Sequence, residues 1–391
     1  MKRNLLAVAA AAVSLGLLAA CGGGGGDAGG TAAEPDVIKV GVNYELSGPV
    51  ATYGEASVKG IEMAFEEINA AGGVDGKQSE IVKYDTKSEP AEATTLATKL
   101  MTQDDVLAII GPATSGSFKA TIPPANQHKI PVVSGSATAE DVTVSNGQLQ
   151  EYAFRTCFSD SYQGTAMANY ATKNRDAKTA VILKDTSSDY AKGLADNFLA
   201  TFEANGGSIV GEEGYVAGET NFNPIRTRIK SLDFDVIYLP GYYEEVGLII
   251  KQARELGITQ PILGGDGFDS PVLLERAGAA ALSDVYYTNH YSSLDQDPKV
   301  QDFIANYNTK YGEDPSAFNA LGYDTAYFVA DAIGRASELT GEAVQQAMAE
   351  TTDFAGVTGT FSIDENHEPV KPALVVELQD GVQVSAEKSA L

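Results

Sequence analysis

The feature that most constrains the fold of this chain is a regular alternation of short apolar runs with stretches of helical periodicity, which begins at Val37. Residues 37–42 have the pattern of a strand. Apolar residues then recur at a 3-4-3 spacing that marks one face of a helix: Val58, Ile61, Phe65 and Ile68. This helix is expected to end at Gly72 and Gly73. The other elements expected in this first series are strands at 81–84, 106–110 and 130–133 and a helix at 91–101.

The alternation starts again after residues 154–156. The second series has expected strands at 180–183, 236–239 and 261–263 and expected helices at 193–204 and 246–256. Strands that alternate with helices predict βαβ units around parallel sheets. The run at 106–110 is short and wholly apolar, which is typical of a parallel strand covered on both faces. The sequence therefore predicts an α/β chain with two doubly wound parallel sheets.

The pattern changes after Pro298. Three helical stretches follow, at 298–311, 316–336 and 341–350, and strand-like segments come last, at 358–363 and 374–378. Two of the helices could complete the first domain, and the final strands could complete the second. Such an arrangement needs the chain to cross between the domains more than once, and periodicity alone leaves the question open.

The first twenty residues have the features of a targeting segment. Lys2 and Arg3 precede an almost wholly apolar run from Leu5 to Leu18, which is short for a membrane span but typical of a cleaved signal peptide. The small residues before Cys21 favour a lipobox, with cleavage before Cys21 and lipidation of its thiol. An ordinary signal peptide with an incidental cysteine is the alternative. Residues 21–36 are glycine-rich and are expected to form a tether with a reach of roughly 20 Å.

Composition excludes several classes of function. The 391-residue chain is too long for one core and suits two domains. Its formal charge is −26, and loss of residues 1–20 would make it −28, a surface that repels nucleic acid. Of the two cysteines only Cys157 would remain unmodified, so no intramolecular disulfide is expected. Cys157 lies in an apolar stretch and is predicted to be a buried, inert thiol.

The segments that follow the predicted strands carry the polar residues that could bind a ligand. In open α/β sheets ligands bind beyond the carboxyl ends of the strands. These segments are 111–117, 134–138, 184–190, 240–244 and 264–267. The first two are rich in glycine and hydroxyl side chains and suit a carboxylate, whereas the later ones offer tyrosines and one acid, Asp266. Together they would match a zwitterion, although each residue taken alone could be a helix cap or a turn residue.

Signatures of catalysis are absent from the sequence. The three histidines, His128, His290 and His367, are far apart and lack metal-ligand spacing. Neither a nucleophile elbow nor a glycine-rich phosphate loop is present. We therefore expect a binding protein without catalytic residues, cofactor or metal, and not an enzyme.

Several segments resemble a known family. Leu46-Ser-Gly-Pro-Val-Ala-Thr-Tyr-Gly54, residues 60–73 with their Ile-Asn-Ala-Ala-Gly-Gly end, and residues 111–115, 134–143 and 265–267 resemble the leucine/isoleucine/valine-binding proteins. These are type I periplasmic solute-binding proteins that serve branched-chain amino-acid ABC importers. The resemblance covers nearly all of residues 37–380.

The resemblance implies two Rossmann-like lobes joined by a three-segment hinge, with crossings near residues 156, 288 and 370. The first lobe would comprise 37–156 and 289–370, and the second would comprise 157–288 and 371–391.

The resemblance also implies a set of ligand contacts. Ser115 and Thr138 match the residues that hold the ligand carboxylate, and Ala113 and Ser136 match positions that lend backbone contacts. Asp266 matches the acid that binds the α-ammonium group, where close relatives have Glu.

Four aromatic residues complete this set. Tyr53, Tyr190 and Tyr242 match aromatics that line or close the cleft, and Phe318 matches one in the side-chain pocket. The segment before Tyr190 is one residue longer than in the family. Ala113 and Thr114 are smaller or more polar than their usual apolar counterparts, which argues against strict branched-chain specificity.

The resulting hypothesis is an exported protein, anchored to the outer face of the cytoplasmic membrane through lipidated Cys21. It would act as a monomer, capture an amino acid by hinge closure and deliver it to the membrane permease of an ABC importer. Two alternatives stay open at this point. The ligand could be an amide, urea, an aromatic acid or a short peptide, or the protein could be a ligand-sensing subunit of a receptor.

Overall fold

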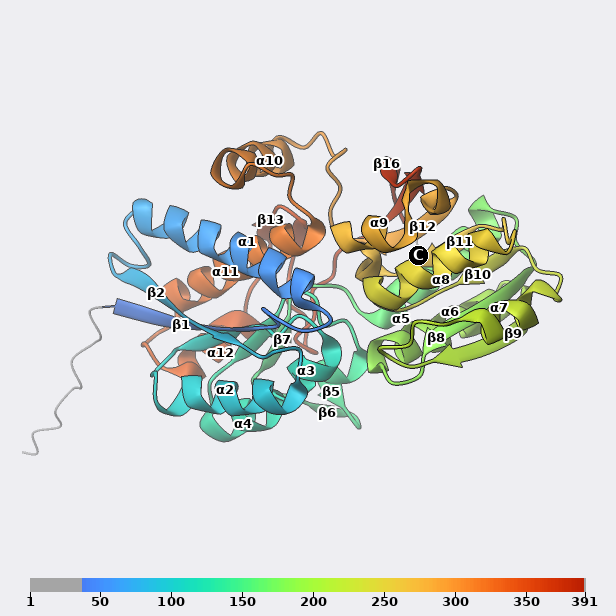
Figure 1. The fold of residues 1–391 in the computed structure, drawn as a ribbon. Helices are drawn as coiled ribbons and strands as arrows, with labels where there is room; N and C mark the ends of the chain where they lie inside the picture. Colours follow the sequence, from blue (N-terminus) through green and yellow to red (C-terminus); the bar gives the residue numbers. More distant parts are fainter. Residues whose placement is uncertain (1–36, 390–391) are drawn as a thin grey trace, which may run out of the picture. The chain divides into compact units, whose positions relative to one another are not determined.

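The computed structural model describes residues 37–389, and a five-stranded parallel sheet organises the first part of that range (Figure 1). Its strand order is β2-β1-β3-β4-β7, the order of a doubly wound fold. The strands are β1 (Val37–Tyr44), β2 (Gln78–Asp85), β3 (Ala108–Ile110), β4 (Val132–Ser134) and β7 (Ala153–Arg155). The predicted signal peptide, Cys21 and the glycine-rich tether lie outside the described residues.

A seven-stranded sheet organises the second part and repeats the same order. Read from one edge it runs β9-β8-β10-β11-β12-β15-β16, and β15 and β16 add in antiparallel orientation to an otherwise parallel sheet. The parallel strands are β8 (Thr179–Asp185), β9 (Ser208–Tyr215), β10 (Val236–Tyr238), β11 (Ile262–Gly264) and β12 (Val285–Asn289). The antiparallel strands are β15 (Leu374–Gln379) and β16 (Val382–Lys388). The predicted α/β fold with two doubly wound sheets is confirmed.

Helices cover both faces of the five-stranded sheet because alternate strand residues point to opposite sides. In β4, Val133 packs in the cluster that holds α1, α11 and α12, whereas Val132 packs with α2, α3 and α4. These helices are α1 (Ala51–Ala70), α2 (Pro90–Thr102), α3 (Ser115–Lys119), α4 (Ile122–His128), α11 (Ala317–Arg335) and α12 (Gly341–Ala349). We call this sheet with these helices the first lobe.

The seven-stranded sheet is covered in the same way. In β10, Tyr238 packs with α5 and α6, whereas Ile237 packs with α7, α8 and α9. The helices are α5 (Asp160–Asn174), α6 (Asp189–Ala204), α7 (Asn223–Lys230), α8 (Tyr243–Glu255) and α9 (Pro271–Ala277). We call this sheet with these helices the second lobe. Within residues 37–389, no helix combines the length and the apolar character needed to cross a membrane.

The chain passes between the lobes three times. It leaves the first lobe after β7, returns after β12, and leaves again before β15. After the second passage, α10 (Pro298–Tyr311) packs with Met63 of α1 and Ala320 of α11, and the hairpin of β13 (Phe354–Gly356) and β14 (Gly359–Phe361) follows α12. The late helices, which periodicity alone could not assign, therefore lie with the first lobe, and the last two strands lie with the second.

Several elements were missed from the sequence, and for three of them the physical reason is plain. Helix α5 buries small residues, among them Gly164, Ala166 and Ala171, so that it shows no stripe of large apolar side chains. Strands β9 and β16 are edge strands with exposed residues, and β9 contains Glu212 and Glu213, which have low strand propensity. Edge strands need little apolar surface, so their sequences carry a weak signal.

Helices α1 and α11 cross closely, and this contact yields a prediction on stability. A Cβ atom on Gly60 would lie 2.0 Å from the carbonyl oxygen of Asn319, whereas one on Gly116 would meet nothing within 4 Å. Gly60→Ala should therefore lower the free energy of unfolding by about 3 kcal/mol, because the two helices must separate. Gly116→Ala, the matched control, should change it by less than about 0.5 kcal/mol. Chemical denaturation measures both, and equal stability of the two variants would refute the close crossing.

Candidate functional site

The candidate site lies where strand order reverses in both sheets, between β1 and β3 in one and between β8 and β10 in the other. Ligands of open α/β sheets bind at such switch points. A narrow cavity of about 10 Å³ lies here, lined by Tyr53, Ala113, Thr114, Ser136, Tyr190, Tyr242, Asp266, Gly267 and Phe318. The side chains of the two walls therefore nearly meet.

The structure brings seven of the nine sequence-predicted ligand contacts to this cavity, and the other two lie beside it. Ser115 begins α3 and its Oγ accepts a hydrogen bond from the backbone N–H of Ala139 at 3.1 Å, which ties the loops after β3 and β4 together. Ser136 Oγ donates to the Ala113 carbonyl at 2.9 Å in the same place. The Thr138 hydroxyl is buried, and it interacts with the buried carboxyl group of Asp160, whose pKa burial raises well above its ordinary value.

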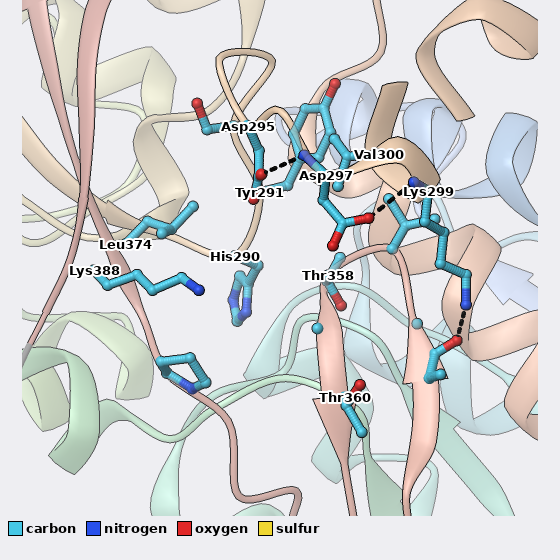
Figure 2. A pocket seen from close by; sticks show the side chains of 16 residues that line it. His290, Tyr291, Asp295, Asp297, Lys299, Val300, Thr358, Thr360, Leu374 and Lys388 are labelled. Atoms are coloured by element: carbon cyan, nitrogen blue, oxygen red, sulfur yellow. Dashed lines mark hydrogen bonds between the residues drawn. The ribbon is translucent and has the colours of Figure 1, made fainter. Parts of the chain in front are cut away.

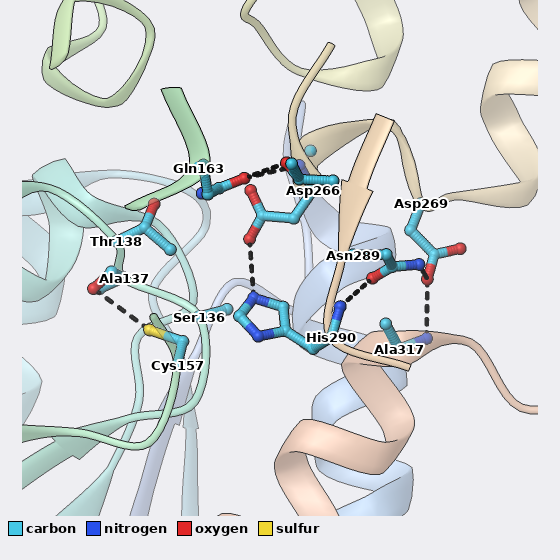
Figure 3. Close-up of polar contacts among 12 residues, drawn as sticks. Ser136, Ala137, Thr138, Cys157, Gln163, Asp266, Asp269, Asn289, His290 and Ala317 are labelled. Carbon is cyan, nitrogen blue, oxygen red and sulfur yellow. Dashed lines mark hydrogen bonds and ion pairs between the residues drawn. The ribbon is translucent and has the colours of Figure 1, made fainter. Parts of the chain in front are cut away.

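Asp266 forms the opposite wall. It lies in the short 3₁₀ helix η2 (Asp266–Phe268), just after β11, and is 3% exposed. Its Oδ1 accepts a hydrogen bond from Tyr190 Oη at 2.8 Å. Its Oδ2 lies 3.2 Å from His290 Nε2 (Figure 3). Burial raises the pKa of Tyr190 well above its ordinary value, as does the neighbouring Asp266, so that the phenol keeps its proton. The acid therefore sits in a fixed orientation.

Aromatic side chains close the space between the walls. Tyr53 comes from α1 of the first lobe, stacks on Phe318 at a centroid distance of 4.3 Å, and meets Tyr242 edge-on at 5.7 Å. Its hydroxyl donates to the carbonyl of Gly267 in the second lobe. Tyr190 stacks on Tyr242 at 5.1 Å. The four predicted aromatics thus form one cluster that spans both lobes.

Further contacts join the lobes around the site. Thr52 Oγ1 and Ser270 Oγ are 3.0 Å apart, and Tyr243 Oη donates to the Pro49 carbonyl at 3.0 Å. Lys119 of α3 also pairs with Asp189 of α6. The structure therefore shows the cleft in a closed form.

Sequence reasoning missed three residues that hold the walls. Glu45 follows β1, and its carboxylate accepts hydrogen bonds from the loop after β3. His290 directly follows β12, and Gln163 lies in α5, where its Oε1 accepts hydrogen bonds from the Asp266 N–H at 3.1 Å and from Thr288 Oγ1 at 2.6 Å. Ligand-binding residues were expected directly after predicted strands, so a prediction of the strand β12 would also have identified His290. Nothing in the sequence distinguishes Gln163 from an exposed helix residue.

The predicted buried thiol is confirmed. Cys157 is fully buried, has no disulfide partner among the described residues, and its Sγ donates to the Ala137 carbonyl at 3.5 Å (Figure 3). Burial raises the pKa of this thiol to about 12, so that it stays protonated and unreactive.

A larger cavity lies on the other side of His290. It has a volume of about 420 Å³, and its lining contains none of the nine predicted ligand contacts (Figure 2). The walls are mixed in charge, with Lys299 and Lys388 as well as Asp295 and Asp297, and the β13–β14 hairpin forms one side. No group of three or more His, Cys, Asp or Glu side chains within the described range could hold a metal ion.

Comparison with known proteins agrees with this fold and geometry. The sequence profile of the periplasmic binding protein family matches residues 37–383. The chain belongs to this family. Its members bind solutes, which places the chain among binding proteins rather than enzymes and confirms the resemblance seen in its sequence motifs.

Individual relatives cover nearly the whole chain. The chain is 31% identical over 331 residues to the leucine-, isoleucine-, valine-, threonine- and alanine-binding protein of Pseudomonas aeruginosa, which covers 84% of this chain and 86% of that protein. It is 42% identical to the branched-chain amino-acid transporter substrate-binding protein LivJ of Streptococcus pneumoniae, solved with isoleucine. That structure has a TM-score of 0.85, with coverage of 90% of this chain and 99% of LivJ. The leucine-binding protein LivK of Thermotoga maritima is 36% identical, with a TM-score of 0.83 and coverage of 90% and 98%.

Glu45 yields a prediction on how the first wall is held. Its carboxylate is fully buried and accepts hydrogen bonds from Ala113 N–H at 2.9 Å, Thr114 N–H at 3.1 Å and Thr114 Oγ1 at 2.7 Å. Burial raises its pKa, whereas these donors lower it. Glu45→Ala should lower the free energy of unfolding by about 2 kcal/mol or more, because buried donors lose their acceptor.

The exposed Glu80 of β2 offers the matched control. Glu80→Ala should change stability by less than about 0.5 kcal/mol. Urea denaturation of both variants measures the difference, and an equally small loss in Glu45→Ala would show that the carboxylate does not support the loop.

Proposed function

We propose that this chain is the lipid-anchored, extracytoplasmic substrate-binding protein of an ABC importer, and that it captures amino acids, above all branched-chain or other apolar ones. The observation that carries the proposal is the pairing of walls in the closed cleft. One wall offers the Thr138 hydroxyl and the loop at Ser115, and the opposite wall offers the Asp266 carboxylate. A free amino acid has one charged end for each wall.

The proposed roles of the residues follow from this geometry. Ser115, Thr138 and the backbone at Ala113 and Ser136 bind the ligand carboxylate. Asp266 then pairs with the α-ammonium group when the second lobe swings in. Hydrogen bonds to charged groups contribute roughly 1.5–3 kcal/mol each, so the two ends together favour the closed form. A ligand shifts the hinge only by as much as it prefers the closed state over the open one.

The aromatic residues define what the ligand side chain meets. Tyr53, Tyr242 and Phe318 line the cavity beside Ala113, so that a ligand side chain contacts apolar ring faces.

The hinge segments proposed for the closing motion are the three passages near residues 156, 288 and 370. The lobes would then comprise 37–156 with 289–370, and 157–288 with 371–391.

Relatives support amino acids over other ligands. LivJ of Streptococcus pneumoniae was solved with isoleucine and shares 42% of its residues with this chain. A solute-binding protein from R. palustris in complex with benzoate has 25% identity and a TM-score of 0.81. A ligand such as benzoate has no amine to pair with the buried Asp266, and leaving that acid unpaired in the closed cleft is costly. The presence of Asp266 therefore favours a ligand with an ammonium group.

A thermal-shift screen of the twenty amino acids tests the function, and an Asp266 variant tests the site. Ligand at 100 times its dissociation constant should add about 2.7 kcal/mol of stability. Asp266→Asn keeps the size of the side chain and removes its charge, and it should weaken binding of the best amino acid about 100-fold in calorimetry. Asp233→Asn, at an exposed position of the second lobe, should leave affinity unchanged. A wild-type protein that none of the twenty stabilises would refute the function, and unchanged affinity in Asp266→Asn would refute the site.

Lipid anchoring at Cys21 is tested separately. Full-length protein, expressed in a bacterium that processes lipoproteins, should incorporate labelled palmitate and sediment with the membranes. Cys21→Ser should lose the label and the sedimentation, because attachment of the lipid requires that thiol. Cys157→Ser should retain both, since Cys157 is buried. A labelled Cys21→Ser protein would contradict the proposed anchor.

A further inference from the structure

His290 occupies a place that touches both the acid of the site and the hinge. It directly follows β12, at the second passage between the lobes, and its side chain is fully buried. Its Nε2 lies 3.2 Å from Asp266 Oδ2. Its ring stacks on Phe158 at a centroid distance of 3.6 Å and an interplanar angle of 15°, and Phe158 lies just beyond the first passage. The imidazole therefore bridges two hinge segments and Asp266.

The imidazole acts as a neutral donor in this position. The pKa of His290 is lowered to about 4, mainly by burial and also by Lys371 of the third passage, against the opposing effect of Asp266. A neutral imidazole donates from one nitrogen only. Because the Asp266 carboxylate accepts, the proton lies on Nε2, and Nδ1 is left as a buried acceptor without a partner among the described residues.

A neutral donor has a consequence that a cationic one would not have. Lysine or arginine at this position would orient Asp266 but would also neutralise its charge. His290 and Tyr190 each take one carboxylate oxygen and leave the negative charge in place. The acid is thus oriented and yet keeps a negative charge that attracts an ammonium group.

Hydrogen bonds continue from His290 to the first lobe. The backbone N–H of His290 donates to Asn289 Oδ1 at 2.8 Å, and Asn289 Nδ2 donates to Asp269 Oδ2 at 3.1 Å. The same oxygen of Asp269 accepts from the Ala317 N–H at 2.8 Å, at the start of α11 (Figure 3). Asp266 is therefore linked through the second passage to a helix of the opposite lobe.

We propose that His290 is a positioning residue, which fixes Asp266 for the ligand ammonium group and ties that acid to the hinge. This inference rests on the proposed function, since it needs a ligand that carries an amine. It differs from a mere packing role, in which the ring would fill space against Phe158 and any aromatic side chain would serve.

Two substitutions separate these roles. His290→Phe keeps an aromatic ring over Phe158 and removes the donor, whereas His290→Gln restores an N–H donor without a ring. Loss of a hydrogen bond to a charged group should weaken leucine binding by about 10- to 100-fold in His290→Phe. His290→Gln should recover affinity to within about fivefold of wild type. His128→Phe, at the end of α4 and far from the site, is the control and should bind like wild type.

Nitrogen NMR of the labelled wild-type protein provides a readout that packing does not affect. The His290 signals should show a neutral ring with its proton on Nε2 between about pH 5 and 8, given its pKa of about 4. Wild-type affinity in His290→Phe, equal losses in both variants, or a proton on Nδ1 would each overturn the inference. A wild-type protein that binds no amino acid would instead overturn the proposed function, while the NMR result would still decide how His290 meets Asp266.

Discussion

The buried carboxylate of Asp266 is the constraint around which the cleft is organised. An ionised side chain removed from water is costly unless hydrogen bonds and an opposite charge compensate it. Tyr190 and His290 supply the hydrogen bonds, and Gln163 holds the backbone at the same residue. Among the described residues no Lys or Arg side chain pairs with this acid. The protein therefore orients the carboxylate, and the compensating positive charge is left to the ligand.

The hinge region is unusually polar for a buried segment. Lys371 at the third passage is buried, donates to Thr358 Oγ1 at 2.9 Å, and has a pKa lowered by burial to about 8. Thr358 in turn donates to Asp324 of α11 at 2.6 Å, and Thr156 meets Thr325 at 2.7 Å. Because these partners must be satisfied in specific directions, they define one arrangement of the three chain segments more sharply than apolar packing would.

How much of this could be predicted from sequence depends on how local each signal is. Strands and helices of the parallel core, such as those at 180–183 and 193–204, carry their periodicity within a few residues and were found. Asp266 and Tyr242 were predicted as ligand-binding residues because they follow strands, and the end of a strand can be recognised from a few neighbouring residues. Phe318 lies inside α11 and was placed only through the resemblance to a family. Glu45 was missed because its role depends on donors 68 and 69 residues away along the chain.

The division of the two walls between separate lobes has a consequence for the transport cycle under the proposed function. Asp266 belongs to the second lobe, whereas Thr138 and Ser115 belong to the first. When the membrane permease opens the two lobes, one charged end of the bound ligand loses its protein partner, and water takes the place of that partner. Discharge of the cargo then requires only a change of angle between two rigid bodies, without protonation, chemical modification or rearrangement of any contact within either half.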